Sequence, residues 1–212
     1  VISASGVSNQ VKAEASFLRA YFMFQVVDLY GQAPFRDPAG PSDANPSVFT
    51  RSAATDFIIK DLEFAEANLG AAPDVNHASK AAAEALLAKV YLNKAVYKAT
   101  TVGGPFTFDA ADMNKVITYA NAVEADGYAL AASGKYFTNF GWDNLTESKE
   151  IIFGLINTST NSPANSRNRW RMGMHYNQKP SSWNGFTTLA DFYKSFEPGD
   201  ERLGGEYKGL TD

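Results

Sequence analysis

The sequence contains no cysteine, only two histidines, and no apolar run near the roughly 18–20 residues that a membrane-spanning helix needs. The lack of cysteine excludes disulfides, thiolate metal sites and cysteine nucleophiles, although it identifies no compartment. His77 and His175 do not form a His-x-x-x-His pair. Calcium-binding EF-hand loops, phosphate-binding glycine loops and G-x-S-x-G elbows are also missing. We therefore expect no catalytic residues, no metal site and no resident cofactor.

The balance of charge is mildly acidic, with a net charge of −4 and a pI near 5.2. Nucleic-acid binding through phosphate contacts needs a basic surface, so we expect no nucleic-acid partner. The only local basic cluster consists of Arg167, Arg169 and Arg171. Residues 1–5 lack the charged start and apolar stretch of a signal peptide, which does not by itself assign the chain to the cytoplasm.

The first long pattern of helical type covers residues 11–30. Its predicted core stripe consists of Ala15, Leu18, Phe22, Val26 and Leu29, with Phe17, Tyr21 and Phe24 beside it. An apolar face this wide is typical of a helix that is buried on more than one side. Gly31 can adopt the left-handed conformation that ends a helix, and Pro34 prevents its resumption.

Three further helices are predicted in the first half, at about residues 53–69, 79–98 and 112–126. In the first of them Ile58, Leu62, Ala65 and Leu69 are in register, and Gly70 follows. Ser79 is the expected N-cap of the next, whose last turn carries Lys94 and Lys98. Because the loops are short, consecutive helices should pack as antiparallel pairs. The fold class is therefore mainly α, an irregular tetratricopeptide-like helical-repeat array.

The sequence changes character after residue 128. Ile151–Ile156 is a short apolar run consistent with a buried strand. Residues 157–185 are rich in Asn, Ser, Arg, Pro and Trp, and one helix is expected at about 187–196. A loop this long is usually functional or disordered. We expect a scaffold at 1–127 and an irregular region with short strands at 128–212, both in one domain.

Five motifs in order resemble the SusD/RagB family. Residues 13–22 read AEASFLRAYF, similar to the family's G-E-A-x-F-L-R-A-x-x-Y-F, and LYGQAP follows at 29–34. Asp61-Leu62 stands in the next helix, and residues 80–92 read KAAAEALLAKVYL. EIIF at 150–153 resembles a family strand; Asn184-Gly185, Phe196 and Asp200-Glu201-Arg202 resemble a later segment. The motifs span most of the chain, with Ala13 and Lys89 replacing the usual Gly and Arg.

The resemblance implies a SusD-like fold and a protein that binds glycans without catalysis. It also implies a lipoprotein on the outer face of the outer membrane that delivers oligosaccharides to a TonB-dependent, SusC-like transporter. The transporter contact is expected on the exposed surfaces of residues 11–30 and 79–98. Family members are about twice as long and carry an N-terminal lipidated cysteine, so we expect this chain to be truncated. Structural calcium stays open within such a family.

A sugar-binding site without catalysis needs exposed aromatic faces beside amide or guanidinium groups. All three tryptophans, Trp142, Trp170 and Trp183, fall in the second half. The predicted glycan contacts are Trp170, Tyr176 and Trp183 as aromatic rings, Asn177 and Asn184 as hydroxyl-binding amides, and Arg169 beside Trp170. Loop tryptophans more often pack beneath their loop, and Trp142, near Phe137 and Phe140, fits that role.

Two other functions remain as alternatives. A glycoside hydrolase needs two carboxylates about 5–10 Å apart across a cleft, and the nearest acidic pairs are Glu147 with Glu150 and Asp200 with Glu201. Both pairs are more simply interpreted as surface and turn charges. A helical-repeat interaction scaffold would bind a peptide in its groove, but the predicted inner stripes are apolar rather than charged.

Overall fold

The computed structural model describes residues 1–101, 103–141, 143–156, 183, 185–186 and 188–203. The chain divides into two compact units, one of Val1–Ala129 with Lys149–Gly154 and the other of Leu130–Ser148 with Leu155–Asp212. The sequence predicts a scaffold at 1–127 and an irregular region at 128–212 within one SusD-like domain. This division stays a prediction. Each unit is described by itself below.

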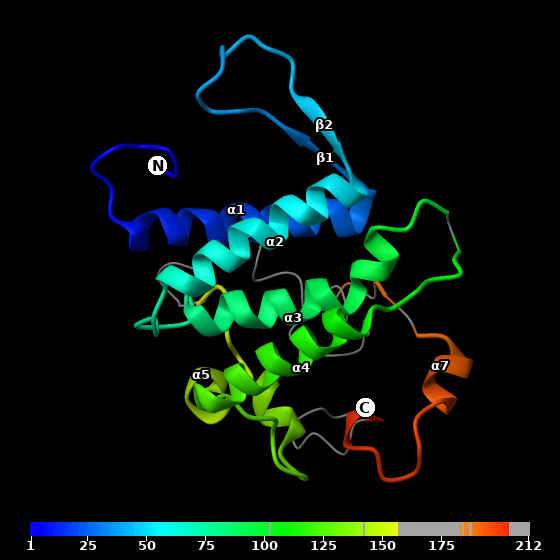
Figure 1. Ribbon diagram of the computed structural model, residues 1–212. Helices are drawn as coiled ribbons and strands as arrows, with labels where there is room; N and C mark the ends of the chain where they lie inside the picture. The colour runs from blue at the N-terminus through cyan, green and yellow to red at the C-terminus, as the bar shows by residue number, and fades with distance from the viewer. Residues whose placement is uncertain (102, 142, 157–182, 184, 187, 204–212) are drawn as a thin grey trace. The chain divides into compact units, whose positions relative to one another are not determined.

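The first unit is built from α-helices, as the sequence predicts. They are α1 (Asn9–Tyr30), α2 (Arg51–Asn68), α3 (Lys80–Tyr97) and α4 (Ala110–Ala125). Each packs against the next in sequence, so that α1 contacts α2, α2 contacts α3, and α3 contacts α4 (Figure 1). The predicted helix-rich class is confirmed, with helix boundaries within about two residues of those expected.

Each of these helices begins at a side chain that caps it. The oxygens of Ser8, Thr50, Ser79 and Asp109 accept hydrogen bonds from the backbone N–H groups of Val11, Ala53, Ala82 and Ala111. Such caps satisfy amide groups that have no partner inside the helix. The predicted N-cap at Ser79 is confirmed. Four caps at four starts explain why the helix beginnings can be recognised in the sequence.

The buried face of α1 differs from the predicted one. Its buried residues are Ala13, Ser16, Phe17, Ala20, Met23, Phe24 and Val27. Leu18, Phe22 and Leu29, predicted to be core, are 40, 63 and 72% exposed. Both faces of α1 are apolar, but Ala13, Ser16 and Ala20 on one of them are small. Because small side chains allow a neighbouring helix to approach closely, this is the face that packs inward.

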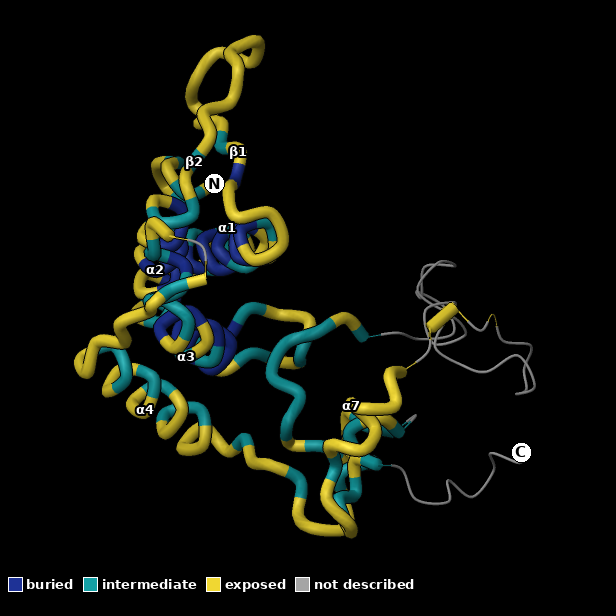
Figure 2. Tube along the Cα trace, turned by 90° about the vertical axis from the view of Figure 1, so that its right-hand side faces the viewer, coloured by how far each residue is buried: buried dark blue, intermediate teal, exposed yellow. Residues whose placement is uncertain are grey.

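Burial falls off from α3 to α4, as Figure 2 shows. The core of α3 includes Leu87 and Val90, both 0% exposed. In α4, all of whose residues are described, none is buried. Its attachment to α3 is partly polar: Lys94 on α3 contacts Asp112 at 2.7 Å, and Lys115 on α4 donates to the hydroxyl of Tyr91 at 2.6 Å. The outer helix is therefore held by side-chain bridges as well as by packing.

A hairpin that the sequence analysis missed separates α1 from α2. Strands β1 (Gln32–Phe35) and β2 (Ser47–Thr50) pair antiparallel, with Ala33 opposite Phe49 and Pro34 opposite Val48. Phe35 and Phe49 stack at 5.1 Å between ring centroids, and both contact Phe57 of α2. The Pro/Gly/Ser-rich residues between Phe35 and Ser47 form the tip of this hairpin (Figure 1).

The predicted strand at Ile151–Ile156 is wrong. Residues 151–156 are not in a strand. Phe153 instead packs its ring edge against Phe17 and Tyr21, at 4.9 and 5.3 Å. Gly154 donates its N–H to the carbonyl of Val75 at 2.9 Å. Phe153 of this run thus packs on α1 by ring contacts.

The described part of the second unit contains short elements only. They are η1 (Tyr136–Phe140), α5 (Asn144–Glu147), α7 (Ala190–Lys194) and η3 (Glu201–Leu203). The helix predicted at 187–196 is thus shorter than expected. The rings of Phe137 and Phe140 contact that of Tyr136, but Phe140 is 63% exposed, and Trp142 lies outside the described residues. Among the described helices of the whole chain, none combines the length and apolar character that crossing a bilayer requires.

Candidate functional site

Of the predicted glycan contacts, the structure describes one. Trp170, Tyr176, Asn177, Asn184 and Arg169 lie outside the described residues. Trp183 is described and is 54% exposed. An indole with half its surface in solvent has a face available for a ligand. The site as a whole stays a prediction.

The residues after Trp183 also present large apolar side chains to solvent. Phe186 is 64% exposed, Leu189 77%, Phe192 61% and Tyr193 56%. Of these, Phe192 contacts the ring of Phe196 edge-on at 5.3 Å. Large exposed apolar side chains gathered in eleven residues of sequence, 183–193, are more typical of an interaction surface than of a solvated loop. Composition marks this segment only weakly, because its aromatic residues look like core residues until their exposure is known.

The Asp200-Glu201-Arg202 motif forms a turn that is closed on itself. The Arg202 guanidinium contacts the Asp200 carboxylate at 2.9 Å, and its backbone N–H donates to the same carboxylate. Hydrogen bonding from the Arg202 side chain lowers the pKa of Asp200 from 3.8 to about 2. Arg202 also lies over the Phe196 ring, at 5.5 Å. Asp200 is therefore ionised and fully engaged by its neighbour.

Glu201 reaches back to an earlier segment of the same unit. Its carboxylate accepts hydrogen bonds from the backbone N–H groups of Gly134 and Tyr136 and from the Ser133 hydroxyl. These contacts, led by the Gly134 N–H, lower the pKa of Glu201. A carboxylate held ionised by backbone donors stabilises a turn and is poorly suited to general acid catalysis. The motif thus joins residues 133–136 to residues 200–202.

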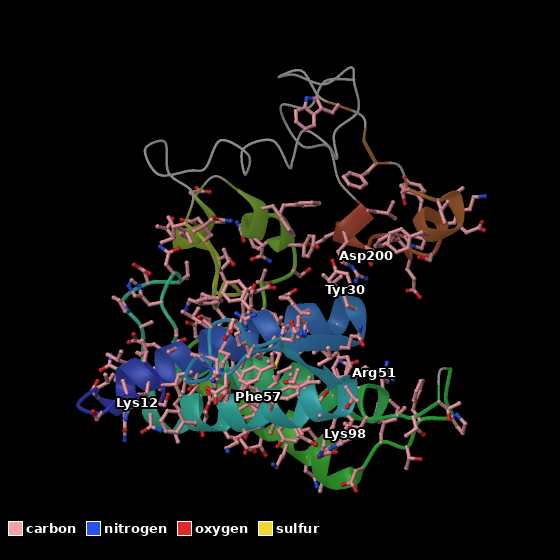
Figure 3. The ribbon with its side chains drawn as sticks, turned by 90° about the horizontal axis from the view of Figure 1, so that it is seen from above. Lys12, Tyr30, Arg51, Phe57, Lys98 and Asp200 are labelled. Carbon is pink, nitrogen blue, oxygen red and sulfur yellow. The ribbon has the colours of Figure 1, made fainter. Side chains whose placement is uncertain are left out.

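A hollow of about 350 Å³ lies on the helical unit, where α3 ends and α4 begins. Six of the residues that line it are Lys94, Lys98, Thr100, Phe106, Thr107 and Asp112. Lys98 contacts both carboxylate oxygens of Asp56 on α2, at 2.6 and 2.7 Å. Figure 3 shows Lys98 and Arg51 at the same end of the helical unit. Sequence reasoning missed this hollow, because its residues come from two helices and the loop between them.

The arginine of the AEASFLRAYF motif has a structural role. Arg19 donates to both carboxylate oxygens of Asp61, at 2.7 and 2.8 Å, and lies over the Phe57 ring at 4.7 Å. Asp61 is 7% exposed, so its charge is compensated inside the α1–α2 interface. Paired, planar geometry of this kind is specific to arginine. Two of the motifs found in the sequence therefore meet in this ion pair, one through Arg19 and the other through Asp61.

Metal-ligating side chains do not gather in the described part of the chain, where no group of three or more His, Asp or Glu residues has suitable geometry. His77 pairs with Asp74 at 2.7 Å in the exposed turn before α3. This contact lowers the pKa of Asp74. It is a local turn contact that orders the approach to the Ser79 cap.

Residues 3–92, which contain α1, the hairpin, α2 and most of α3, match the SusD-like family model described as "starch-binding associating with outer membrane". In this region the chain is similar to the SusD-like family. The predicted resemblance is thereby confirmed, and the motif residues at 13–22, 61–62 and 80–92 fall in the matched helices. The comparison with curated proteins returned no match.

Solved SusD-like structures share the fold. A SusD-like protein from Bacteroides fragilis NCTC 9343 is 27% identical, with a TM-score of 0.53 over 71% of this chain and 28% of its own. A structure solved with a xylogluco-oligosaccharide is 26% identical, with a TM-score of 0.53 over 66% of this chain and 28% of its own. A SusD-like carbohydrate-binding protein from Bacteroides vulgatus ATCC 8482 is 19% identical, with a TM-score of 0.67 over 95% and 42%.

The chain therefore spans less than half the length of each of these three structures. Because the third structure is only 19% identical, its similarity shows a shared fold and nothing further. The shared fold agrees with the helix-rich class predicted from the sequence. The glycan-contact residues lie beyond the matched region and are not tested by it.

Proposed function

We propose that this chain is a non-catalytic glycan-binding protein of the bacterial cell surface, which captures oligosaccharides and delivers them to a TonB-dependent outer-membrane transporter. The observation that carries the proposal is the match of residues 3–92 to a family described as starch-binding and associated with the outer membrane. The xylogluco-oligosaccharide in a related structure supports a glycan as the ligand class. Attachment to the membrane would occur through a lipid anchor.

The absence of catalysis is supported by the state of the candidate carboxylates. Asp200 is paired with Arg202, and Glu201 accepts backbone hydrogen bonds, so neither is available to protonate a leaving group. Both have lowered pKa values, whereas a glycosidase acid needs a raised one. Glu147 and Glu150 fall in different compact units. Binding that leaves the saccharide intact agrees best with these observations.

The site we propose for the glycan is the surface around Trp183, with Trp170 and Tyr176 as further rings and Asn177, Asn184 and Arg169 as hydroxyl-binding groups. Aromatic rings contact the C–H faces of a sugar, and amide or guanidinium groups bind adjacent hydroxyls. The exposure of Trp183 supports this assignment. We propose that no cofactor takes part, and structural calcium is tested below.

Calorimetric titration of the 212-residue chain with malto-, cello- and xylogluco-oligosaccharides tests the proposal. Trp183→Ala is expected to weaken affinity about fivefold to tenfold, because one stacked ring is lost. Phe22→Ala, which removes an exposed ring from α1, is the matched control and should leave affinity unchanged. Addition of a calcium chelator should also have no effect. Unchanged affinity in Trp183→Ala, with an intact helical circular-dichroism signal, would place the site elsewhere.

Product analysis of the same mixtures separates binding from hydrolysis. We expect the oligosaccharides to be recovered intact after prolonged incubation. Cleavage that is abolished by Glu201→Gln or Glu150→Gln would show an enzyme and overturn the proposal. A folded chain that binds none of the saccharides would also contradict it.

The transporter contact is proposed on the exposed surfaces of α1 and α3. On α1 this surface includes Leu18, Phe22 and Leu29. Mixing the chain with a purified SusC-like barrel and measuring co-elution tests the contact. A complex that persists undiminished in a Leu18→Ser/Phe22→Ser variant would exclude α1 from it, and absence of any complex would exclude the transporter as a partner of this chain.

A further inference from the structure

We infer that the hollow between α3 and α4 is a second saccharide subsite, which binds a neutral sugar separately from the surface around Trp183. The inference rests on the proposed glycan-binding function and names a site for it on the helical unit. The lining includes Lys94, Lys98, Thr100, Phe106, Thr107 and Asp112. Its volume of about 350 Å³ is at the lower end of ligand pockets and suits about one or two sugar rings.

One wall of the hollow is fixed by contacts among three helices. Arg51 at the start of α2 donates to the carbonyls of Tyr97 and Ala99, at 3.0 and 3.2 Å. These contacts hold the end of α3 in place and satisfy its last carbonyl group and that of Ala99 just beyond it. Lys94 is held by Asp112 of α4, and Lys98 by Asp56 of α2. The polar groups of this wall therefore have set positions before any ligand arrives.

The loop that carries Phe106 also lines the hollow. Gly103 and Gly104 have φ values of 84° and 83°, a conformation that other residues rarely adopt. A Cβ atom on Gly104 would lie 3.3 Å from two carbon atoms of the Phe106 ring. Glycine at this position thus allows the ring to lie against the backbone. Phe106 remains 36% exposed and offers part of its surface to the hollow.

The rim of the hollow supplies hydroxyl groups that the protein does not use itself. Among the described residues, the side chains of Thr100, Thr101 and Thr107 make no hydrogen bond with another protein group. A hydroxyl both donates and accepts, as sugar hydroxyls require. Ammonium donors, a carboxylate acceptor, threonine hydroxyls and a ring edge together match the mixed surface of a pyranose.

The pairing of the charged side chains in the hollow favours a neutral sugar over an acidic one. Each of the two lysines in the lining is paired with a carboxylate, Lys94 with Asp112 and Lys98 with Asp56. An acidic sugar or a phosphate would have to compete with these carboxylates, whereas a neutral hydroxyl can hydrogen-bond to a pair without separating it. The geometry therefore favours a neutral saccharide over an anionic one.

Amide-resolved NMR titration of the 212-residue chain tests the subsite, with maltose, cellobiose and a xylogluco-oligosaccharide as probes. We expect shifts at the amides of residues 103–107, with saturation, in the wild type and equally in Trp183→Ala. Phe106→Ala should weaken that response about fivefold. Phe108→Ala removes a ring that is 50% exposed and absent from the lining, and it should leave the response unchanged. Thr107→Val, which keeps the shape but loses the hydroxyl, should also weaken it.

The outcomes separate this inference from the proposed function. Shifts confined to residues near Trp183 would overturn the subsite and leave glycan binding intact. No shift anywhere in a folded chain would overturn both. Shifts at 103–107 that Phe106→Ala does not weaken would contradict the assigned ring contact. A stronger response to inorganic phosphate than to the neutral sugars would overturn the class of ligand.

Discussion

Glu84 on α3 is the one charged residue of the described core that lacks full compensation. It is 2% exposed, and its Oε2 atom has no hydrogen-bond partner among the described residues. Lys80 lies 3.5 Å from the other oxygen, on the exposed side. Burial raises the pKa of Glu84 above its ordinary value of 4.5, and the ammonium of Lys80 opposes this in part. The folded state therefore holds the Glu84 proton more tightly than the unfolded state does.

Glu84→Gln is expected to change how stability depends on pH. Because the folded pKa is raised, the contribution of Glu84 is most favourable below about 4.5 and is lost as pH rises through the folded pKa. The glutamine variant should lack this loss, so its stability relative to wild type should increase from pH 4 to pH 7. Urea unfolding at several pH values measures it. Glu124→Gln, at an exposed position of α4, is the control, and a constant difference for Glu84→Gln would contradict the raised pKa.

Phe17 and Phe22 form a matched pair on α1, at 1 and 63% exposure. Phe17→Ala should lower the free energy of unfolding by about 3–5 kcal/mol, because it leaves a cavity beneath Phe153 and Tyr21. Phe22→Ala should change it by less than about 0.5 kcal/mol. Thermal or urea unfolding followed by circular dichroism at 222 nm measures both. Equal losses would mean that the buried face of α1 has been assigned wrongly.

At the scale of elements, Gly31 and Gly70 illustrate two ways to end a helix. Gly31 has a φ of 69°, and its N–H donates to the carbonyl of Val27 at 2.8 Å. Gly70 follows Leu69, the extended C-cap of α2, and its φ lies outside the left-handed region. A Cβ atom would meet nothing within 4 Å at either position. The sequence predicts both glycines as helix ends, but only Gly31 needs to be glycine.

Gly31→Ala should therefore destabilise the helical unit by about 1–2 kcal/mol, the cost of a left-handed alanine. Gly70→Ala is the matched control, and it should be neutral or slightly stabilising, since it restricts the unfolded chain without strain. Both are measured as shifts in the urea midpoint. Equal destabilisation by the two variants would contradict the difference in backbone conformation.

Helices were predicted correctly because their capping residues and periodicity lie within a short stretch of sequence. Strands were predicted wrongly because a strand forms only where another segment pairs with it. Helix starts carry their own caps, so α3 is recognisable from Ser79. The hairpin of β1 and β2 depends on contacts of Phe35 and Phe49 with Phe57, which no short window of sequence contains. Ile151–Ile156 has the composition of a strand, but it is not in a strand, and Phe153 packs on Phe17 of α1. Strand assignment needs a partner, and the sequence does not supply one.

For the whole molecule, the weakly acidic net charge of −4 limits how glycans are bound. Contacts by rings and hydroxyls displace few counterions, unlike contacts to phosphates. Affinity for a neutral oligosaccharide should therefore change by less than about twofold between about 50 and 500 mM NaCl. Calorimetry at the two salt concentrations measures it. A much steeper fall would indicate an acidic glycan, with the cluster of Arg167, Arg169 and Arg171 as its natural partner.

The sequence by itself determined the helix-rich class, the helix ends and the SusD-like motifs, because caps, periodicity and motif order are properties of neighbouring residues. It also excluded chemistry that needs cysteine. Only the tertiary structure decided that Phe17 rather than Phe22 is buried, that Arg19 serves Asp61, and that Glu201 holds the turn at Gly134. The hollow beside Phe106 was likewise visible only in the tertiary structure, because it is lined by residues of α3, α4 and the loop between them. Burial and pairing depend on which surfaces meet, and residues far apart in the chain settle that together.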